Sequence, residues 1–477
     1  MSTARTLLML CLAWTAALAG CGGTSFQTDL AALYEQAGQN IGPERNPVVV
    51  IPGVLGSKLE AFDGRSVWGA FVYGAADADK PDGARLVAVP MRRGVPLSQL
   101  TDDVEATDVL DQLTLDVGLL RGLKLSAYVD ILMTLAAGQY RDQSLGRSGA
   151  INYGGAHYTC FQFPYDWRRD VSEQVVEFHE LIQASKAAHR AGYGLPDDAP
   201  VKVDVVAHSM GGLVLRYYLR YGPNPLPEDG SLPALTWEGA EHVERAILVG
   251  TPNAGSVLSL KQLVNGWDLH PIAPNYRPSV LGTMPAIYQL LPRARHNRVV
   301  HAATGRPIDV LDIETWDRFG WGLASDEPDR ALAWLLEDVP EEERAAVARD
   351  HLEKCLARAE QLHAALDIPA APPPGLVIHL FAGDAADTPT LVTVDEAGRL
   401  AIAEMGPGDD TVTRASALMD ERVGAPYIPR LRSPIYFTSV RFLEANHLGL
   451  TKSPNFTNNL LYLLLEDDVR GSAPLGG

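Results

Sequence analysis

The stretch Val201-Lys202-Val203-Asp204-Val205-Val206-Ala207-His208-Ser209-Met210-Gly211-Gly212 decides the fold of this chain. Four valines among its first six residues are typical of a buried strand, and helix-forming residues follow the two glycines. Ser209 would then stand on a sharp strand-to-helix turn, which is a nucleophile elbow written A-x-S-x-G-G. Ala207 and Gly211 satisfy the need for small residues where strand and helix backbones approach closely. The stretch therefore predicts Ser209 as a nucleophile; an ordinary loop serine is the alternative.

Working outward, further short apolar runs predict the other strands of the same sheet. They lie at 47–53, 157–163, 243–250, 376–383 and 434–440. None alternates cleanly with polar residues, which is expected of strands covered by helices on both faces. Helical segments are predicted at 171–190, 210–221 and 456–465. This alternation of strands and helices indicates an α/β domain with a mostly parallel central sheet.

Two long stretches interrupt that alternation, at about 57–150 and about 256–370. Insertions of this length in a compact domain are usually functional, and we interpret both as caps or lids. The first contains a predicted helix at 124–140 whose apolar residues recur at helical spacing. In the second, the acidic run 341–344 predicts a helix start, and the Pro-rich run 370–375 a stiff return to the sheet.

A catalytic serine needs a base, and the base needs a carboxylate that holds its tautomer. In an elbow-bearing fold the chain order is serine, acid, histidine, which favours His447 after the last predicted strand. His208 adjoins the serine, but it should point away from the hydroxyl, so we assign it a structural role. The acid stays open from the residues alone: Asp384 follows a strand, and Asp409 and Asp410 follow a predicted hairpin.

The first strand ends in the Gly-rich turn Pro52-Gly53-Val54-Leu55-Gly56-Ser57. Backbone N–H groups of this turn could join that of Met210 in an oxyanion hole. A phosphate-binding loop is the alternative, but no Gly-Lys-Ser/Thr follows the turn. No Cys/His spacing indicates zinc either. We therefore expect neither a metal nor a cofactor.

The N-terminus has the features of a secretory signal, with Arg5 as its only charge and an apolar run at 7–19. The following Leu18-Ala19-Gly20-Cys21 resembles the lipobox of bacterial lipoproteins. We therefore predict a signal peptide over 1–20, lipidation of Cys21 and a tether over 21–45. This would anchor the protein to a membrane of the cell envelope, in the periplasm or at the outer membrane. An ordinary secretory signal with an incidental cysteine is the alternative.

The formal net charge is −19, and Lys and Arg form no extended cluster. Such a balance makes nucleic acid an improbable partner and disfavours electrostatic adsorption to anionic lipid. Beyond the signal region, Cys160 and Cys355 are the remaining cysteines. We interpret them as two buried free thiols, with a disulfide as the alternative.

Several segments, in order from about residue 46 to 450, resemble the lecithin:cholesterol acyltransferase family, including its lysosomal phospholipase and phospholipid:diacylglycerol acyltransferase relatives. The matching segments are 47–60, Pro164-Tyr165-Asp166-Trp167-Arg168, 207–212, Gly250-Thr251-Pro252-Asn253, 284–292, 316–320, Gly408-Asp409-Asp410-Thr411-Val412 and 447–449. The resemblance implies an α/β-hydrolase fold, here over 46–477, with the two insertions as lid and cap.

The resemblance also implies Asp409 as the acid of a Ser209–Asp409–His447 triad, and it implies Val54 and Met210 as the oxyanion donors. The chain departs from the family in beginning its elbow with Ala207, in lacking the lid cysteines, and in matching weakly over 71–150.

We expect a serine-dependent O-acyltransferase or phospholipase that acts on lipid esters, with an alcohol as the acyl acceptor. A plain lipase or carboxylesterase that uses only water is the first alternative. The second is a lipoprotein that keeps the scaffold as an inactive binding module.

Overall fold

The computed structural model describes residues 28–469, except 72–74, 111, 118–119, 127, 269–274, 425 and 427. For residues 71, 112–117 and 120–126 it describes the backbone alone. The predicted signal peptide and the lipidation site Cys21 lie outside the described residues. Within the described part of the chain, no helix is both long and apolar enough to cross a bilayer.

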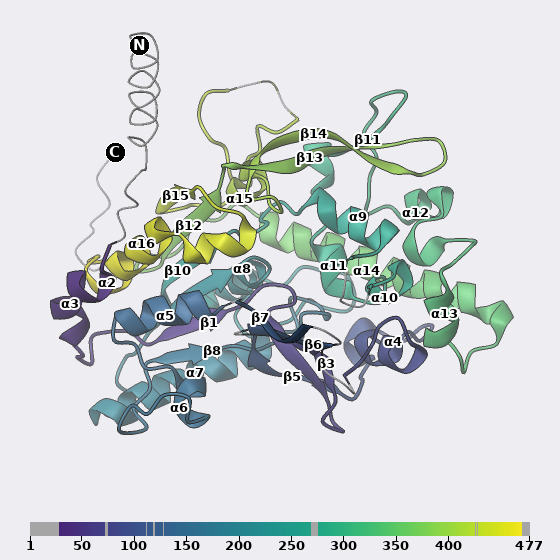
Figure 1. Cartoon of the computed structure of the whole chain (residues 1–477). Helices are drawn as coiled ribbons and strands as arrows, with labels where there is room; N and C mark the ends of the chain where they lie inside the picture. The colour runs from purple at the N-terminus through teal and green to yellow at the C-terminus, as the bar shows by residue number, and fades with distance from the viewer. Residues whose placement is uncertain are drawn as a thin grey trace, which may run out of the picture.

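A six-stranded sheet forms the centre of the molecule (Figure 1). Its strand order is β15(Ser439–Leu443), β12(Val377–Gly383), β10(Val243–Val249), β9(Val203–His208), β1(Val48–Ile51) and β8(Cys160–Gln162). Every neighbouring pair is parallel. The prediction of a mostly parallel α/β sheet is confirmed, and each predicted strand region contributes one strand.

The last strand begins later than the sequence indicated, at Ser439 rather than at Pro434, and it continues to Leu443. Pro434 has no backbone N–H to offer a neighbouring strand. The next residue, Ile435, packs with Ala254 and Met419 in a small apolar cluster. The apolar residues of this run therefore serve packing outside the sheet, and pairing with β12 starts after them.

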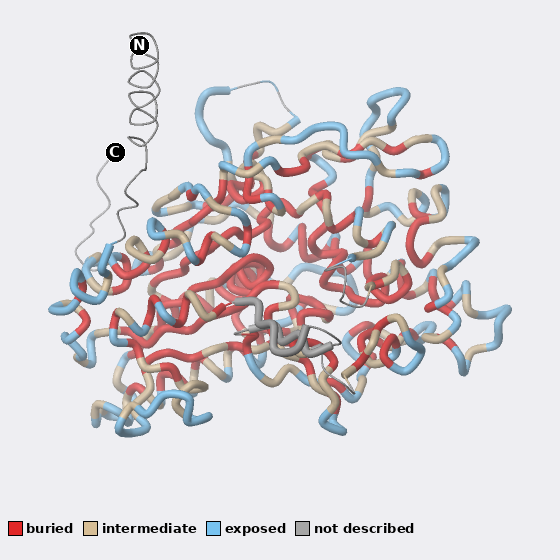
Figure 2. The backbone as a smooth tube through the Cα atoms, viewed as in Figure 1, coloured by how far each residue is buried: buried red, intermediate tan, exposed pale blue. Residues whose placement is uncertain are grey.

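Helices cover both faces of the sheet, and the central strands β1 and β9 are accordingly buried along their whole length (Figures 1 and 2). Val49 and Ile51 belong to the larger core, which includes residues of α7(Val175–Tyr193) and α8(Gly211–Tyr221). Val48 and Val50 face the other core, formed with α5(Val129–Ala137) and α16(Pro454–Leu465). Three layers result, with the buried strands between two layers of helices.

The helix predicted at 124–140 begins later, because residues Leu120–Ser126 form the strand β7. β7 pairs antiparallel with β6(Gln112–Val117). The sequence Leu123-Lys124-Leu125 has the period of two that a strand requires, and the helical spacing holds only from Tyr128 onward. Helix α5 then packs against the central sheet, so it is part of the layered core.

The remainder of the first long stretch forms small sheets and short helices. Its elements are β2(Ser57–Ala61), β3(Ser66–Trp68), β4(Ala70–Phe71), α4(Pro81–Val87), η2(Leu97–Gln99), β5(Val104–Val109) and α6(Gln143–Arg147). They follow α2(Leu30–Leu33) and α3(Glu35–Gln39), two short helices in the stretch predicted as a tether.

The second long stretch is mainly helical. Its elements are α9(Val257–Asn265), α10(Pro278–Leu281), α11(Pro285–Gln289), η4(Ala294–His296), β11(Val299–His301), α12(Ile313–Phe319), η5(Gly322–Ala324), α13(Arg330–Leu335) and α14(Glu341–Asp367). Helix α14 begins at the predicted acidic run, whose charges favour the positive end of the helix dipole. The hairpin β13(Ala386–Val394) and β14(Leu400–Gly408) follows β12, as predicted.

Cys160 lies in β8 and Cys355 in α14, and both are buried free thiols. Burial raises the pKa of each thiol, so both stay protonated and unreactive at neutral pH. The prediction of two unpaired buried cysteines is confirmed.

Candidate active site

Ser209 occupies the turn between β9 and α8 in a left-handed conformation, with φ of 54°. Its N–H donates to the carbonyl oxygen of Val249 at 2.8 Å, which ties the turn to the neighbouring strand β10. A non-glycine residue rarely adopts this conformation, and such strain is characteristic of functional turns. Ser209 therefore stands at a sharp strand-to-helix elbow, as the sequence predicted.

The two glycines after the elbow have no room for a side chain. A Cβ on Gly211 would lie 2.3 Å from the carbonyl oxygen of Pro52. A Cβ on Gly212 would lie 2.0 Å from the hydroxyl oxygen of Thr251. The sequence predicted the need for a small residue at Gly211. Glycine is needed at Gly212 because the Gly-Thr-Pro-Asn segment lies directly against α8.

The structure brings Ser209, His447 and Asp409 together in one chain of hydrogen bonds. The hydroxyl oxygen of Ser209 lies 2.9 Å from Nε2 of His447, and Nδ1 of His447 lies 2.8 Å from Oδ2 of Asp409. Asp409 is 1% exposed and His447 9% exposed, so water competes little for these bonds. His447 starts the 3-10 helix η6(His447–Lys452), and its backbone N–H donates to the carbonyl oxygen of Asp409 at 2.7 Å.

The second carboxylate oxygen of Asp409 is also occupied. Oδ1 accepts the backbone N–H groups of Thr411 at 3.1 Å and Val412 at 2.6 Å. By contrast, Asp410 is exposed and its carboxylate accepts from the hydroxyl of Thr411. Of the carboxylates that the sequence left open, Asp409 is thus the one that contacts the base.

His208 does not reach the nucleophile, in agreement with the role expected for it. Its Nδ1 lies 3.0 Å from the hydroxyl of Tyr128, and its Nε2 lies 3.2 Å from the carbonyl oxygen of His447. Burial, assisted by the nearby His447 ring, lowers the pKa of His208 to about 3. The ring is therefore neutral at physiological pH.

The Gly-rich turn after β1 lies beside the nucleophile. A Cβ on Gly53 would be 2.7 Å from Cβ of Ser209, so only glycine fits at this approach. Among the residues that the structure describes, neither the N–H of Val54 nor that of Met210 donates to a protein acceptor. Two free donors next to an elbow serine are what an oxyanion hole requires.

Three aromatic side chains hold this turn. The indole N–H of Trp68 donates to the carbonyl oxygen of Leu55 at 2.7 Å. The hydroxyl of Tyr165 donates to the carbonyl oxygen of Pro52 at 3.1 Å, and the indole N–H of Trp167 donates to the carbonyl oxygen of Ser57 at 3.3 Å. Tyr165 and Trp167 belong to the Pro-Tyr-Asp-Trp-Arg segment, so this motif acts by supporting the turn. Sequence reasoning missed Trp68.

The charged residues of the same motif form a buried ion cluster. Arg168 is fully buried and contacts Asp166 at 2.7 Å and Asp102 at 2.9 Å. Burial alone would raise the pKa of Asp166, but the guanidinium groups of Arg168 and Arg169 together outweigh burial and hold this pKa below its usual value. The cluster fixes the strand exit from which Tyr165 and Trp167 extend.

The Gly-Thr-Pro-Asn segment packs against Asp409 and His447. A Cβ on Gly250 would lie 3.2 Å from both Oδ2 of Asp409 and Cε1 of His447. The side-chain amide of Asn253 donates to the carbonyl oxygen of Ala417 at 2.7 Å. The hydroxyl of Ser416 donates to the carbonyl oxygen of Gly255 at 2.6 Å. These bonds join the loop after β10 to the segment that carries Asp409.

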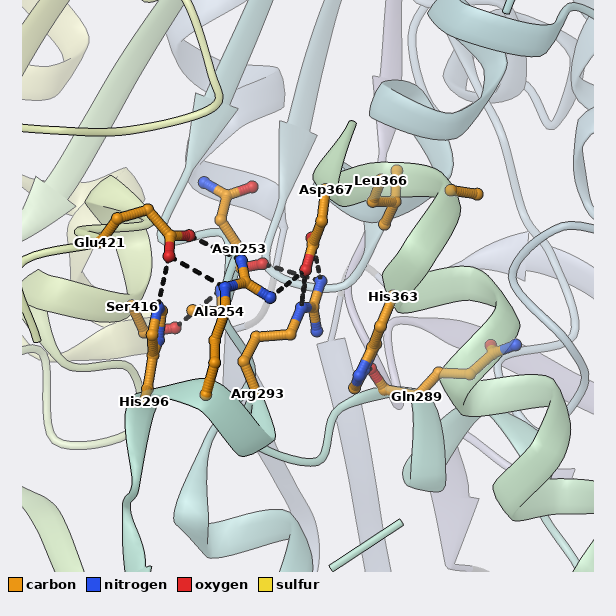
Figure 3. Close-up of polar contacts among 12 residues, drawn as sticks. Asn253, Ala254, Gln289, Arg293, His296, His363, Leu366, Asp367, Ser416 and Glu421 are labelled. Atoms are coloured by element: carbon orange, nitrogen blue, oxygen red, sulfur yellow. Dashed lines mark hydrogen bonds and ion pairs between the residues drawn. The ribbon is translucent and has the colours of Figure 1, made fainter. Parts of the chain in front are cut away.

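The far side of this segment meets the C-terminal end of α14 (Figure 3). Asp367 pairs with Arg293 at 2.9 Å and with Arg295 at 2.6 Å. Two arginines of α8 approach the same helix end: Arg216 donates to the carbonyl oxygen of Leu366 at 2.8 Å, and Arg220 to that of Ala365 at 3.4 Å. Arg216 also donates to the side-chain oxygen of Asn253 at 3.1 Å.

The sheet, its two helical layers and the elbow define an α/β-hydrolase fold. Residues 148–316 match the model of the family described as "Lecithin:cholesterol acyltransferase", which confirms the resemblance over that segment. The matched segment includes the elbow, the Pro-Tyr-Asp-Trp-Arg motif and the Gly-Thr-Pro-Asn motif. Val54, Asp409 and His447 lie outside it.

One similar solved structure is described as "The crystal structure of Tle4-Tli4 complex". The alignment covers 88% of this chain and 98% of that chain, with a TM-score of 0.59 and 16% identity. At that identity the likeness shows the fold alone. No curated protein matches the chain in sequence. The family match and the fold together support an enzyme that transfers or hydrolyses the acyl groups of lipid esters.

Proposed function

We propose that the protein is a serine-dependent O-acyltransferase or phospholipase that works through an acyl ester on Ser209. The observation that carries the proposal is the unbroken contact from Ser209 through His447 to Asp409, at 2.9 and 2.8 Å. These distances are within reach for direct proton transfer.

In the first half-reaction, the Ser209 hydroxyl oxygen attacks the ester carbonyl carbon and Nε2 of His447 takes its proton. The backbone N–H groups of Val54 and Met210 donate to the oxyanion of the tetrahedral intermediate. Loss of one such donor typically costs about 10²–10³ in rate. Collapse of the intermediate breaks the bond to the leaving alcohol, which takes the proton from His447.

In the second half-reaction, an acceptor hydroxyl attacks the acyl-serine and gives its proton to His447. That proton returns to Ser209 as the acyl group departs. An alcohol acceptor yields a new ester, and water yields a free fatty acid. The triad serves both outcomes, so the acceptor that reaches the acyl-serine first decides the product.

Apolar side chains near the nucleophile and the base suit a lipid substrate. Val54 and Leu55 are partly exposed in the turn beside Ser209. Leu448 follows the base directly and is 55% exposed. Hydrocarbon chains gain free energy by leaving water for such surfaces. We further propose that lipidated Cys21 keeps the enzyme at a cell-envelope membrane, where lipid esters and acceptor lipids are concentrated.

Product analysis by mass spectrometry tests the proposal. Phospholipid vesicles containing a sterol, a diacylglycerol or a long-chain alcohol are incubated with the wild type, with Ser209→Ala and with Ser98→Ala as an exposed-serine control. We expect acylated acceptor from the wild type and the control only. If free fatty acid is the sole product with every acceptor, the protein is a plain lipase or phospholipase. A folded wild type that a fluorophosphonate does not label would instead indicate an inactive binding module.

A further inference from the structure

The oxyanion turn and the base are joined by a second chain of hydrogen bonds that does not pass through the nucleophile. The backbone N–H of Gly53 donates to the hydroxyl oxygen of Tyr128 at 2.7 Å. That hydroxyl lies 3.0 Å from Nδ1 of His208, whose Nε2 lies 3.2 Å from the carbonyl oxygen of His447. The chain therefore begins one residue before Val54 and ends on the base itself.

The direction of every bond in this chain is fixed. Gly53 can only donate, so the Tyr128 oxygen accepts there and uses its single proton toward His208. A carbonyl can only accept, so Nε2 of His208 carries a proton and Nδ1 is left free to accept from Tyr128. A neutral imidazole has just these capacities. Burial keeps His208 in that neutral form, with a pKa of about 3.

The chain is shielded from water. Tyr128 is 4% exposed and His208 2% exposed. The two rings meet edge to face, with centroids 5.5 Å apart, and the His208 ring lies 4.8 Å from the His447 ring. A buried group that loses its partner cannot replace it with solvent, so each bond constrains its neighbour strongly.

We propose that Tyr128 and His208 are positioning residues that hold the oxyanion turn and the base in register with each other. The inference rests on the proposed function. The N–H of Gly53 is held by Tyr128, and its carbonyl oxygen accepts from the N–H of Gly56 at 3.0 Å. The peptide planes on both sides of Gly53 are therefore fixed, and the N–H of Val54 keeps its direction. At the other end, the backbone of His447 is held on both sides, by Asp409 through its N–H and by His208 through its carbonyl oxygen.

Variants of the two residues test the inference, with hydrolysis of a p-nitrophenyl acyl ester as the assay. Tyr128→Phe removes one oxygen and breaks both of its bonds. His208→Leu removes the link, whereas His208→Gln can restore it, because an amide oxygen accepts from Tyr128 and an amide N–H donates to His447. Tyr140→Phe is the matched control, a buried tyrosine of the same layer that stacks on Arg45.

We expect kcat to fall about 10- to 100-fold in Tyr128→Phe and His208→Leu, which corresponds to the usual cost of leaving buried groups unpaired. KM should change less than about twofold, and His208→Gln should recover most of the lost rate. The control should match the wild type. Because the residues act as one chain, Tyr128→Phe combined with His208→Leu should be no slower than the slower single variant.

Three results would overturn the inference: kcat within twofold of the wild type in folded Tyr128→Phe, no advantage of His208→Gln over His208→Leu, or additive losses in the double variant. Thermal melting establishes that each variant is folded, and Tyr128→Phe keeps the test decisive if His208→Leu does not fold. A wild type with no Ser209-dependent activity overturns the proposed function as well. Ser209-dependent activity that is unchanged in Tyr128→Phe overturns this inference alone.

Discussion

Replacing Asp409 by asparagine should leave the geometry of the site intact and move the ring proton of His447 from Nδ1 to Nε2. In the structure Oδ1 of Asp409 accepts two backbone N–H groups, at 3.1 and 2.6 Å, and Oδ2 faces Nδ1 of His447 at 2.8 Å. The single oxygen of an asparagine must stay with the two N–H groups, because an amide NH₂ there would oppose two donors. Its NH₂ then faces Nδ1 of His447.

That arrangement forces the wrong tautomer on the base. Nδ1 must accept from the amide, so the ring proton moves to Nε2, which can no longer take the proton of Ser209. A change of this kind lowers kcat by about 10⁴ in serine hydrolases, equivalent to about 5.4 kcal/mol of barrier. We expect the same loss in Asp409→Asn, with little change in melting temperature.

Ester hydrolysis and the rate of fluorophosphonate labelling measure the effect. The exposed neighbour provides the matched control, since Asp410→Asn makes the same chemical change outside the chain of contacts. Asp384→Asn addresses the rival carboxylate at the end of β12. The reasoning would be refuted if Asp409→Asn kept more than a tenth of the wild-type rate, or if Asp384→Asn lost more than Asp409→Asn.

Three other perturbations have defined outcomes. Gly53→Ala should lower kcat about 100-fold, because its Cβ would lie 2.7 Å from Cβ of Ser209 and displace the oxyanion turn; activity within twofold of the wild type would contradict this. Lowering the pH from 7 to 5 should lower the free energy of unfolding. Histidines become protonated in the unfolded chain, whereas buried histidines of low pKa stay neutral in the folded protein. Each such proton lowers the free energy of unfolding by about 1.4 kcal/mol per pH unit. Asp204 and Glu173, whose pKa values burial raises to about 6 and about 8, oppose this trend. A urea midpoint that rises on acidification would show that they prevail over His208, His351, His363 and His379, with pKa values of about 3 to 4. Finally, Cys21→Ser should move the protein from the detergent phase to the aqueous phase in Triton X-114, and equal partitioning would refute the lipid anchor.

The sequence was sufficient for the sheet and for Ser209 and His447, two members of the proposed triad. Buried strands and the elbow depend on local composition, so their positions follow from short runs of residues. His447 follows from chain order, since it comes after the last strand. The start of β15 was misplaced because apolar residues can pack outside a sheet, as Ile435 does.

The choice of acid needed the family resemblance, and the structure explains why. Asp384 directly follows β12, and the hairpin β13–β14 returns the chain to the same edge of the sheet. A Cβ on Gly383 would lie 2.5 Å from Cβ of Asp409. Both carboxylates therefore reach one edge of the sheet, and no local pattern separates them.

Tyr128 and Trp68 show a different limit. Tyr128 fits the apolar stripe of a helix, and it is indeed buried, but its hydroxyl contacts residues 75 and 80 positions away. Periodicity reports which face of a helix is buried, and it carries no information about a partner so distant in the chain. Such contacts emerge only when the insertion is placed against the sheet.

The arginines around the end of α14 restrict how this enzyme could be re-engineered. Arg216 and Arg220 are each 4% exposed, and the carbonyl groups at the end of α14 accept their hydrogen bonds. A chimera that exchanged the whole second insertion would leave these buried donors without their acceptors, at a cost of about 1–3 kcal/mol for each group left unpaired. A donor segment should therefore be joined between residues 297 and 340, so that α14 and its partners Arg293 and Arg295 remain with their host.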